Sequence, residues 1–252
     1  MNFRNLFCVI LGLILCPTIA VAQRGEANPK WTGFYLGINS GGLINDSKGT
    51  LEPSGDFLIP PTSADNPLRT DSMDFDRSAF TGGAQAGYNY QYKWLLVGLE
   101  TDFNYSSLRE KDFVSRNLAV PLGGTFSHTV KDKLLWFGTV RPRIGLTWKP
   151  LLIYATGGFS YGHIKSDTIA VFSAGGDTYS GSSSKTRTGW NVGGGVEGLI
   201  LKHWSLKLEY LFVDLGKLKY TDYERTVFPT YTYTTSLENR YHIIRVGLNY
   251  HF

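Results

Sequence analysis

Apolar and polar residues alternate with a period of two along most of this chain, and this alternation predicts β-strands. In the last such segment, Ile244, Val246 and Leu248 alternate with Arg245 and Gly247. Eight segments show the pattern and are predicted as strands: Gly33–Gly41, Ala79–Gln91, Leu95–Tyr105, Leu134–Trp148, Leu152–His163, Gly189–Ile200, Trp204–Val213 and Tyr241–Phe252.

The connections between these segments alternate between short and long. Tight turns are expected at Tyr92-Lys93, Lys149-Pro150 and Leu201–His203, and long polar segments are expected to form loops at Gly42–Ser78, Ser106–Lys133, Lys165–Thr188 and Asp214–Arg240. Bacterial membrane barrels have an even number of strands, short periplasmic turns and long external loops. The sequence therefore predicts an all-β fold, a single eight-stranded antiparallel transmembrane β-barrel with four long extracellular loops.

The two rows of each predicted strand differ in a way that favours lipid outside and polar groups inside. The apolar rows carry no charged residue, and the opposite rows are rich in glycine, asparagine, serine and glutamine. A soluble barrel would instead place its apolar rows inside and many lysines and glutamates outside. An arginine or lysine that faces lipid at the bilayer midplane costs about 2–4 kcal/mol, which accounts for the absence of charge from the apolar rows.

Eight charged residues fall on the polar rows, four acids and four bases: Glu100, Asp102, Glu197, Glu209, Arg141, Arg143, Lys207 and Arg245. An eight-stranded barrel is only wide enough to hold its own side chains. Unpaired charges inside it would be very costly, so we expect these eight residues to form an internal network of ion pairs with a structural role. A proton or ion path through the lumen is the functional alternative.

Aromatic residues gather near the predicted strand ends, where the two membrane interfaces should lie. Trp136 and Trp148 are twelve residues apart on one strand. At about 3.3 Å per residue and a tilt near 40°, they are separated by about 30 Å, close to the height of an apolar band with its aromatic girdles.

The first 22 residues have the features of a cleaved signal peptide. Arg4 precedes the apolar run Leu6–Leu15, and Ala20-Val21-Ala22 is a typical cleavage site. We therefore expect residues 1–22 to be removed and residues 23–252 to form the barrel in the outer membrane. The two cysteines, Cys8 and Cys16, lie in the segment expected to be removed, which excludes a disulfide or a cysteine metal site from the mature chain.

Several local sequences resemble a known family. They include Trp31-Thr-Gly-Phe-Tyr-Leu-Gly-Ile-Asn, Gly189-Trp-Asn-Val-Gly-Gly-Gly-Val-Glu-Gly, Trp204-Ser-Leu-Lys-Leu-Glu-Tyr-Leu-Phe-Val-Asp-Leu-Gly and the ending Val246-Gly-Leu-Asn-Tyr-His-Phe. Together they resemble the small outer-membrane immunogenic proteins, a group of OmpA-like β-barrel surface antigens. The resemblance covers all eight predicted strands and implies a surface protein that supports envelope integrity and acts as an antigen. Some members are called porins or hemin-binding proteins.

The resemblance also implies an assembly signal at the C-terminus and a set of partners for this protein. Phe252, with apolar residues at alternate positions before it, resembles the signal that the outer-membrane assembly machinery reads. The expected partners are this machinery, outer-membrane lipid and lipopolysaccharide, and a host or surface ligand that binds the loops. The net charge of +4 without a basic stripe does not indicate a nucleic-acid partner.

The sequence indicates no catalytic, cofactor or metal site. His128, His163 and His242 are predicted near the outer rim, where hemin could bind, but their spacing is not that of a ligand set. No nucleophile, base and orienting group fall together, so no enzyme is predicted. The leading hypothesis is a structural and interaction protein of the outer membrane. A narrow porin-like channel and a hemin-binding surface protein are the alternatives.

Overall fold

The computed structural model describes residues 31–56, 71–117, 124–173, 177–224 and 231–252. These residues form eleven strands: β1 (Gly33–Asn45), β2 (Ser47–Gly55), β3 (Asp71–Phe75), β4 (Ser78–Tyr92), β5 (Leu95–Ser106), β6 (Arg109–Asn117), β7 (Thr125–Trp148), β8 (Leu151–Phe172), β9 (Asp177–Leu199), β10 (Trp204–Glu224) and β11 (Tyr231–His251). In this part of the chain, no helix is long and apolar enough to cross a membrane. The predicted signal peptide lies outside the described residues.

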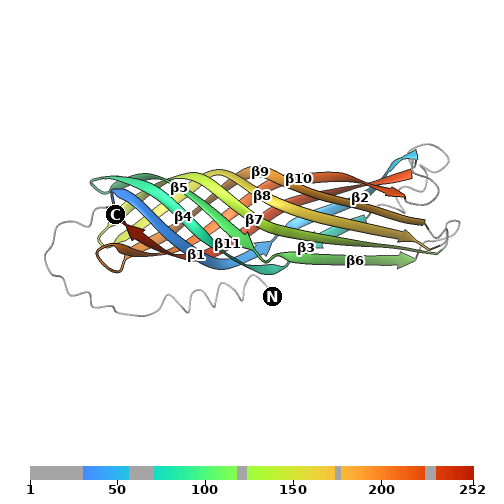
Figure 1. The fold of residues 1–252 in the computed structure, drawn as a ribbon, viewed down its shortest axis with the longest axis horizontal. Helices are drawn as coiled ribbons and strands as arrows, with labels where there is room; N and C mark the ends of the chain where they lie inside the picture. The colour runs from blue at the N-terminus through green and yellow to red at the C-terminus, as the bar shows by residue number, and fades with distance from the viewer. Residues whose placement is uncertain (1–30, 57–70, 118–123, 174–176, 225–230) are drawn as a thin grey trace.

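Eight of the strands close into an antiparallel ring, as predicted. Their order is β1-β4-β5-β7-β8-β9-β10-β11, and β11 pairs back onto β1 from Tyr35↔His251 to Asn45↔Tyr241. Figure 1 shows the tilted strands of an elongated barrel, with the C-terminus at the end where β4 turns into β5. We call this end the turn end, because the connections β4–β5, β7–β8 and β9–β10 are all short there. Short turns are periplasmic in bacterial barrels, so the opposite end faces the outside of the cell.

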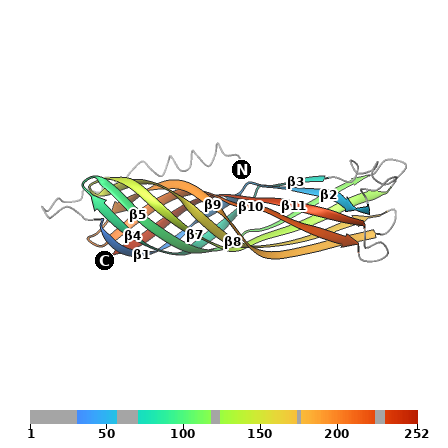
Figure 2. The same cartoon turned by 90° about the horizontal axis from the view of Figure 1, so that it is seen from above.

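The barrel continues well beyond the predicted strands. In the chain, β2 follows almost directly on β1, β3 directly precedes β4, and β6 follows almost directly on β5. β2 pairs with β11, and β6 pairs with β7. β7 to β11 run on into the same region (Figure 2). The four segments predicted as long loops are therefore largely β-structure where the structure describes them. We call β2, β3, β6 and the adjoining parts of β7–β11 the outer section, and the ring below it the membrane section.

The polarity of the two faces reverses between the sections. In the membrane section of β7, Arg141 and Arg143 face inward, while Ile144 is 55% exposed on the outside. In the outer section of the same strand, Val130 is buried inside and Lys131 is exposed. A register shift between Leu134 and Trp136 separates the two parts. Lipid outside the membrane section and water outside the outer section account for this reversal.

The interior consequently has three layers. A small apolar cluster closes the turn end: Trp31, Leu96, Leu152 and Tyr154. Polar and charged side chains fill the middle, and a large apolar core fills the outer section: Leu43, Leu51, Leu108, Phe126, Val130, Leu134, Phe137, Ile164, Ala170, Tyr179, Leu211, Val213, Leu215, Leu218, Tyr233, Leu237, Tyr241 and Ile243. The outer core was not predicted.

Candidate functional site

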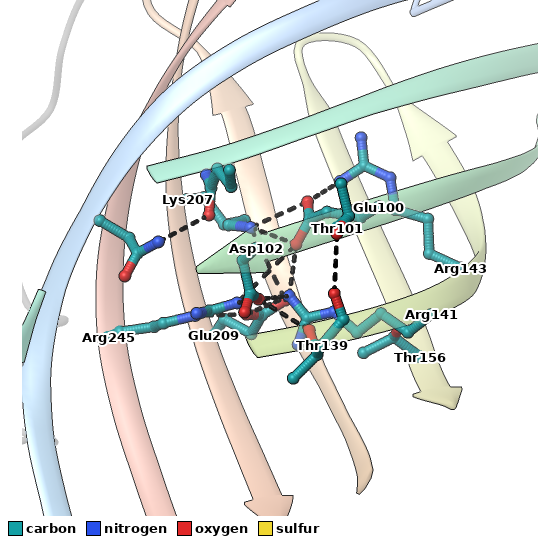
Figure 3. A network of polar contacts seen from close by, with 12 residues as sticks. Glu100, Thr101, Asp102, Thr139, Arg141, Arg143, Thr156, Lys207, Glu209 and Arg245 are labelled. Atoms are coloured by element: carbon teal, nitrogen blue, oxygen red, sulfur yellow. Dashed lines mark hydrogen bonds and ion pairs between the residues drawn. The ribbon is translucent and has the colours of Figure 1, made fainter. Parts of the chain in front are cut away.

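The middle layer of the lumen holds all eight of the charged residues singled out from the sequence. Glu100 and Asp102 come from β5, Arg141 and Arg143 from β7, Glu197 from β9, Lys207 and Glu209 from β10, and Arg245 from β11. Each is at most 3% exposed. Their alternation along each strand places the side chains on the inner face, and the ring brings them together across the lumen (Figure 3).

The eight side chains form one connected network of ion pairs. Arg245 Nη2 lies 2.7 Å from both Asp102 Oδ2 and Glu209 Oε2. Arg141 contacts Glu100 and lies 3.0 Å from Glu209. In the same network Lys207 Nζ donates to Glu100 Oε1 at 2.9 Å. Every charge therefore has an opposite charge nearby, which offsets part of the cost of removing these groups from water.

The ion pair between Arg143 and Glu197 extends the network toward the turn end. Arg143 Nη1 lies 3.0 Å from Glu197 Oε2, and its Nε donates to Asn89 Oδ1 at 2.8 Å. Its guanidinium carbon lies 4.6 Å from the ring centroid of Tyr35 and 5.3 Å from that of Tyr154. A planar cation held near two aromatic rings gains cation–π attraction in addition to its ion pairs. Arg143 is thus fixed on several sides.

Two tyrosines belong to the site, although the sequence analysis did not identify them. Tyr35 Oη donates to Glu100 Oε2 at 2.6 Å, and Tyr154 Oη donates to Glu209 Oε1 at 2.7 Å. Both tyrosines lie on the inward rows of their strands. Their place on the same face as the charged residues was the signal in the sequence that could have identified them. Hydroxyl donors to buried carboxylates stabilise the charged form and hold it in place.

Glycines on the inward rows make room for these rings. A Cβ atom at Gly87 would lie 2.3 Å from Tyr35 Oη, and one at Gly195 would lie 2.8 Å from Tyr154 Oη. A narrow barrel has space for a large inward side chain only where the facing position is small. The glycines of the polar rows therefore serve the packing of the lumen.

Amide and hydroxyl side chains, also not identified from the sequence, extend the network around the ring. Gln85 Nε2 donates to Asn249 Oδ1 at 2.5 Å, and Asn249 Nδ2 donates to Glu197 Oε1 at 2.7 Å. Thr139 Oγ1 donates to Asp102 Oδ2 at 2.9 Å. With these contacts, all eight strands of the ring contribute side chains to the middle layer.

Further carboxyls are buried in the outer section, above the charged network. Burial, together with the charge of the nearby Glu110, raises the pKa of Asp132 to about 7. The pKa of Asp222 is raised to about 6 by burial, although the hydroxyl of Thr235 donates to its carboxylate and lowers the pKa in part. The interior of the outer section thus favours neutral carboxyl groups.

The three histidines predicted near the rim do not point to a common place. His128 faces the interior and is 1% exposed. His163 lies outside and stacks on Trp136, with ring centroids 5.7 Å apart, while His242 stacks on Tyr210 on another strand. In the part of the chain that the structure describes, no cluster of three or more His, Cys, Asp or Glu residues is arranged to hold a metal ion.

Phe252 lies on the outside of the turn end. Its side chain is 69% exposed, and its backbone N–H donates to the carbonyl oxygen of Phe34 at 3.0 Å. The terminal residue is thus tied to β1, where the ring closes.

Comparison with known proteins identifies the family. The family model described as an outer membrane protein beta-barrel domain matches residues 11–252. The chain belongs to this family. It is therefore an outer-membrane β-barrel protein.

The relatives of this outer-membrane barrel include named bacterial proteins. It is 37% identical over 229 residues to the 31 kDa outer-membrane immunogenic protein of Brucella melitensis, a match that covers 88% of this chain and 84% of the relative. A 22 kDa outer membrane protein of Rhizobium leguminosarum is 31% identical over 206 residues, covering 81% and 70% of the two chains.

Among solved structures, the barrel is similar to two outer-membrane proteins at low sequence identity. The outer membrane protease OmpT of Escherichia coli aligns with a TM-score of 0.48 at 12% identity, over 91% of this chain and 99% of that chain. OprG of Pseudomonas aeruginosa aligns with a TM-score of 0.47 at 12% identity, over 88% and 97%.

Proposed function

We propose that this protein is a non-conducting structural barrel that supports the outer membrane and presents its outer section as an interaction surface and antigen. The observation that carries the proposal is the filled lumen. A layer of mutually paired charges lies between two apolar layers, and all three are buried. Because packed side chains fill the interior, a mechanical role is favoured over a transport role.

The three layers make an ion path costly. An ion that enters from outside would first meet the core around Phe126 and Leu237, whose apolar side chains cannot replace the water that the ion would lose. It would then have to break ion pairs such as Arg245–Asp102 and pass the cluster around Trp31. Apolar constrictions block conduction by excluding water. This arrangement speaks against the porin-like alternative.

The hemin-binding alternative finds no support in the histidines. His163 and His242 lie on the outer surface of different strands, and His128 lies inside the barrel. An iron ligated by two of them would require an outward and an inward side chain to meet, or two separate strands to approach. We therefore do not propose hemin binding for these residues.

The surface and antigen role is supported by the relatives. The 31 kDa protein of Brucella melitensis, the 22 kDa protein of Rhizobium leguminosarum and a 25 kDa protein of Brucella abortus, 27% identical over 223 residues, are described as outer-membrane proteins, and the two Brucella proteins as immunogenic. The outer section carries an exposed, water-facing surface on which antibodies or a host ligand could bind. We propose the outer-membrane assembly machinery as a further partner, which would read Phe252 during insertion.

Conductance of the purified protein in planar lipid bilayers tests the proposal. We expect no steady openings above the background of protein-free bilayers, while a general porin inserted in the same way conducts. The Arg141→Ala variant is recorded beside the wild type because it alters only the lumen. Steady wild-type openings whose size changes in that variant would place the current in this lumen and overturn the proposal.

A further inference from the structure

A row of positive charges lies across three neighbouring strands on the outside of the barrel. Arg109 of β6 is the direct cross-strand partner of Lys133 of β7, and Lys133 is the direct partner of Lys165 of β8. The next row outward pairs Lys111 with Lys131. Like charges placed directly opposite each other destabilise a sheet. The arrangement therefore has a cost that an external anion would remove.

Within the residues that the structure describes, no carboxylate forms an ion pair with Arg109, Lys133 or Lys165. At another place on the outer section, two bases share one carboxylate: Lys217 lies 2.8 Å from Glu238, and Arg240 lies 3.2 Å from the same side chain. Asp167 is the acid nearest in register and faces Lys131 in the second row. The cationic row, Arg109–Lys133–Lys165, is thus a set of three bases in direct cross-strand register on adjacent strands, without an ion-paired acid among the described residues.

An aromatic wall lies directly below the cationic row, toward the membrane. Trp136 contacts His163, Phe103 at 5.4 Å and Tyr161 at 6.2 Å between ring centroids. Such rings mark the interface between lipid tails and head groups. Lys165 follows Tyr161 by four residues, which places it about 10 Å farther out on a strand tilted near 40°. This is the depth of the head groups of the outer leaflet.

A groove lies directly above the cationic row, away from the membrane. Its volume is about 620 Å³, and its wall includes Lys131 and Asp167 of the second row. Hydroxyl side chains make up most of the remaining lining: Thr129, Thr168, Thr178, Ser180, Ser182 and Thr221. Ser180 Oγ has no hydrogen-bond partner among the described residues. Hydroxyls together with a charged pair suit a polyhydroxyl ligand such as a sugar, which needs many donors and acceptors.

We propose that this face binds a phosphorylated glycolipid of the outer leaflet. Its acyl chains would lie against the wall around Trp136, its phosphates would bind Arg109, Lys133 and Lys165, and its sugars would extend toward the groove. The order of apolar, cationic and hydroxyl surfaces along the barrel matches the order of acyl chain, phosphate and sugar in such a lipid. The inference deepens the lipid contact of the proposed envelope role, but it does not depend on whether the lumen conducts.

The test compares two triple variants of the full protein folded in zwitterionic detergent. In the first, Arg109, Lys133 and Lys165 are each changed to Gln. In the matched control, Lys48, Lys217 and Lys219 are changed to Gln, which removes the same charge from β2 and β10. The probe is bisphosphorylated lipid A, and the amount retained by the protein on size-exclusion chromatography gives the affinity.

We expect the first triple variant to bind lipid A at least about tenfold more weakly than the wild type and the control to stay within about twofold, because each surface cation contributes separately to attraction of anionic lipid. Lipid A stripped of its phosphates should bind wild type as weakly as lipid A binds the first variant. Millimolar inorganic phosphate should not displace lipid A, since it lacks the acyl chains.

Three results would overturn the proposal. Equal weakening of lipid A binding in both triple variants would show general electrostatic attraction. Undiminished binding of the dephosphorylated lipid would show that the phosphates are not recognised. Displacement of lipid A by inorganic phosphate would show a site for free anions. The shift of the folded band on gels with and without boiling verifies that each variant is folded. If the triple variant does not fold, the exposed Lys165→Gln single variant is measured instead, with a loss of about threefold expected against Lys219→Gln.

Discussion

Removal of one charge from the lumen network should destabilise the barrel strongly. Arg245 is buried and contacts both Asp102 and Glu209 at 2.7 Å. Arg245→Leu leaves four acids facing three bases in a space closed to water. Breaking a buried ion pair by removal of one partner costs about 3–5 kcal/mol, because the remaining charge is left without compensation. We expect a loss of that size in the free energy of unfolding.

A charge-balanced double variant distinguishes this explanation from a simple loss of packing. Arg245→Leu with Asp102→Leu leaves three acids and three bases, so the double variant should be less destabilised than the sum of the two single changes by at least about 2 kcal/mol. Val246→Ala on the lipid-facing row of the same strand serves as the control, with an expected loss of about 1 kcal/mol.

Urea titration of the protein in lipid vesicles, followed by tryptophan fluorescence, measures these free energies. An Arg245→Leu variant that loses less than about 1 kcal/mol, or a double variant whose loss equals the sum of the single losses, would contradict the account. The first result would mean that the network is hydrated, and the second that its members are not coupled.

Two further predictions concern the packing and the pH dependence of the barrel. Gly87→Ala should displace the ring of Tyr35 and cost about 1–3 kcal/mol of stability in the same urea titration. Gly42→Ala, where an added Cβ has no atom within 4 Å, should cost less than about 0.5 kcal/mol. Equal costs in the two variants would refute the packing argument. Because the pKa of Asp132 is raised from 3.8 to about 7, its carboxyl binds protons more tightly in the folded state, and the outer section should lose up to about 4 kcal/mol of stability as the pH rises from about 4 to about 7. Hydrogen exchange of the β7 amides near Asp132, corrected for the intrinsic rates, should show this loss in the wild type and a much smaller one in Asp132→Asn; an equal pH dependence in both proteins would rule out Asp132 as its source.

The ring and its inward charges could be predicted because the membrane imposes one simple rule. Lipid excludes charge from the outer row, so residues such as Arg141 and Glu209 had to face inward. Four acids and four bases on the inward face then implied that they form ion pairs with one another. Which acid contacts which base depends on strand tilt and register, and neither can be read from one strand alone.

The outer section was not predicted because its polarity is reversed. Outside the membrane, outward side chains meet water, so Lys131 and Lys133 alternate with the buried Val130 and Leu134. In the sequence, strands were identified by their apolar outward rows, so segments with polar outward rows were predicted as loops. Many of their outward residues are serine and threonine, which are common in both loops and strands. The register shift before Trp136 also moves the inward face to the other set of positions.

The most direct test of the account is the contact of its outward rows with lipid. Nitroxide labels on single cysteines at Leu206 and Val246 are compared with one at Lys219, using residues 23–252, which contain no native cysteine. In lipid vesicles, we predict that oxygen relaxes the labels at positions 206 and 246 more than a water-soluble nickel complex does, and that the nickel complex dominates at position 219. Nickel access at positions 206 and 246 equal to that at position 219 would contradict a barrel that turns these rows toward the bilayer.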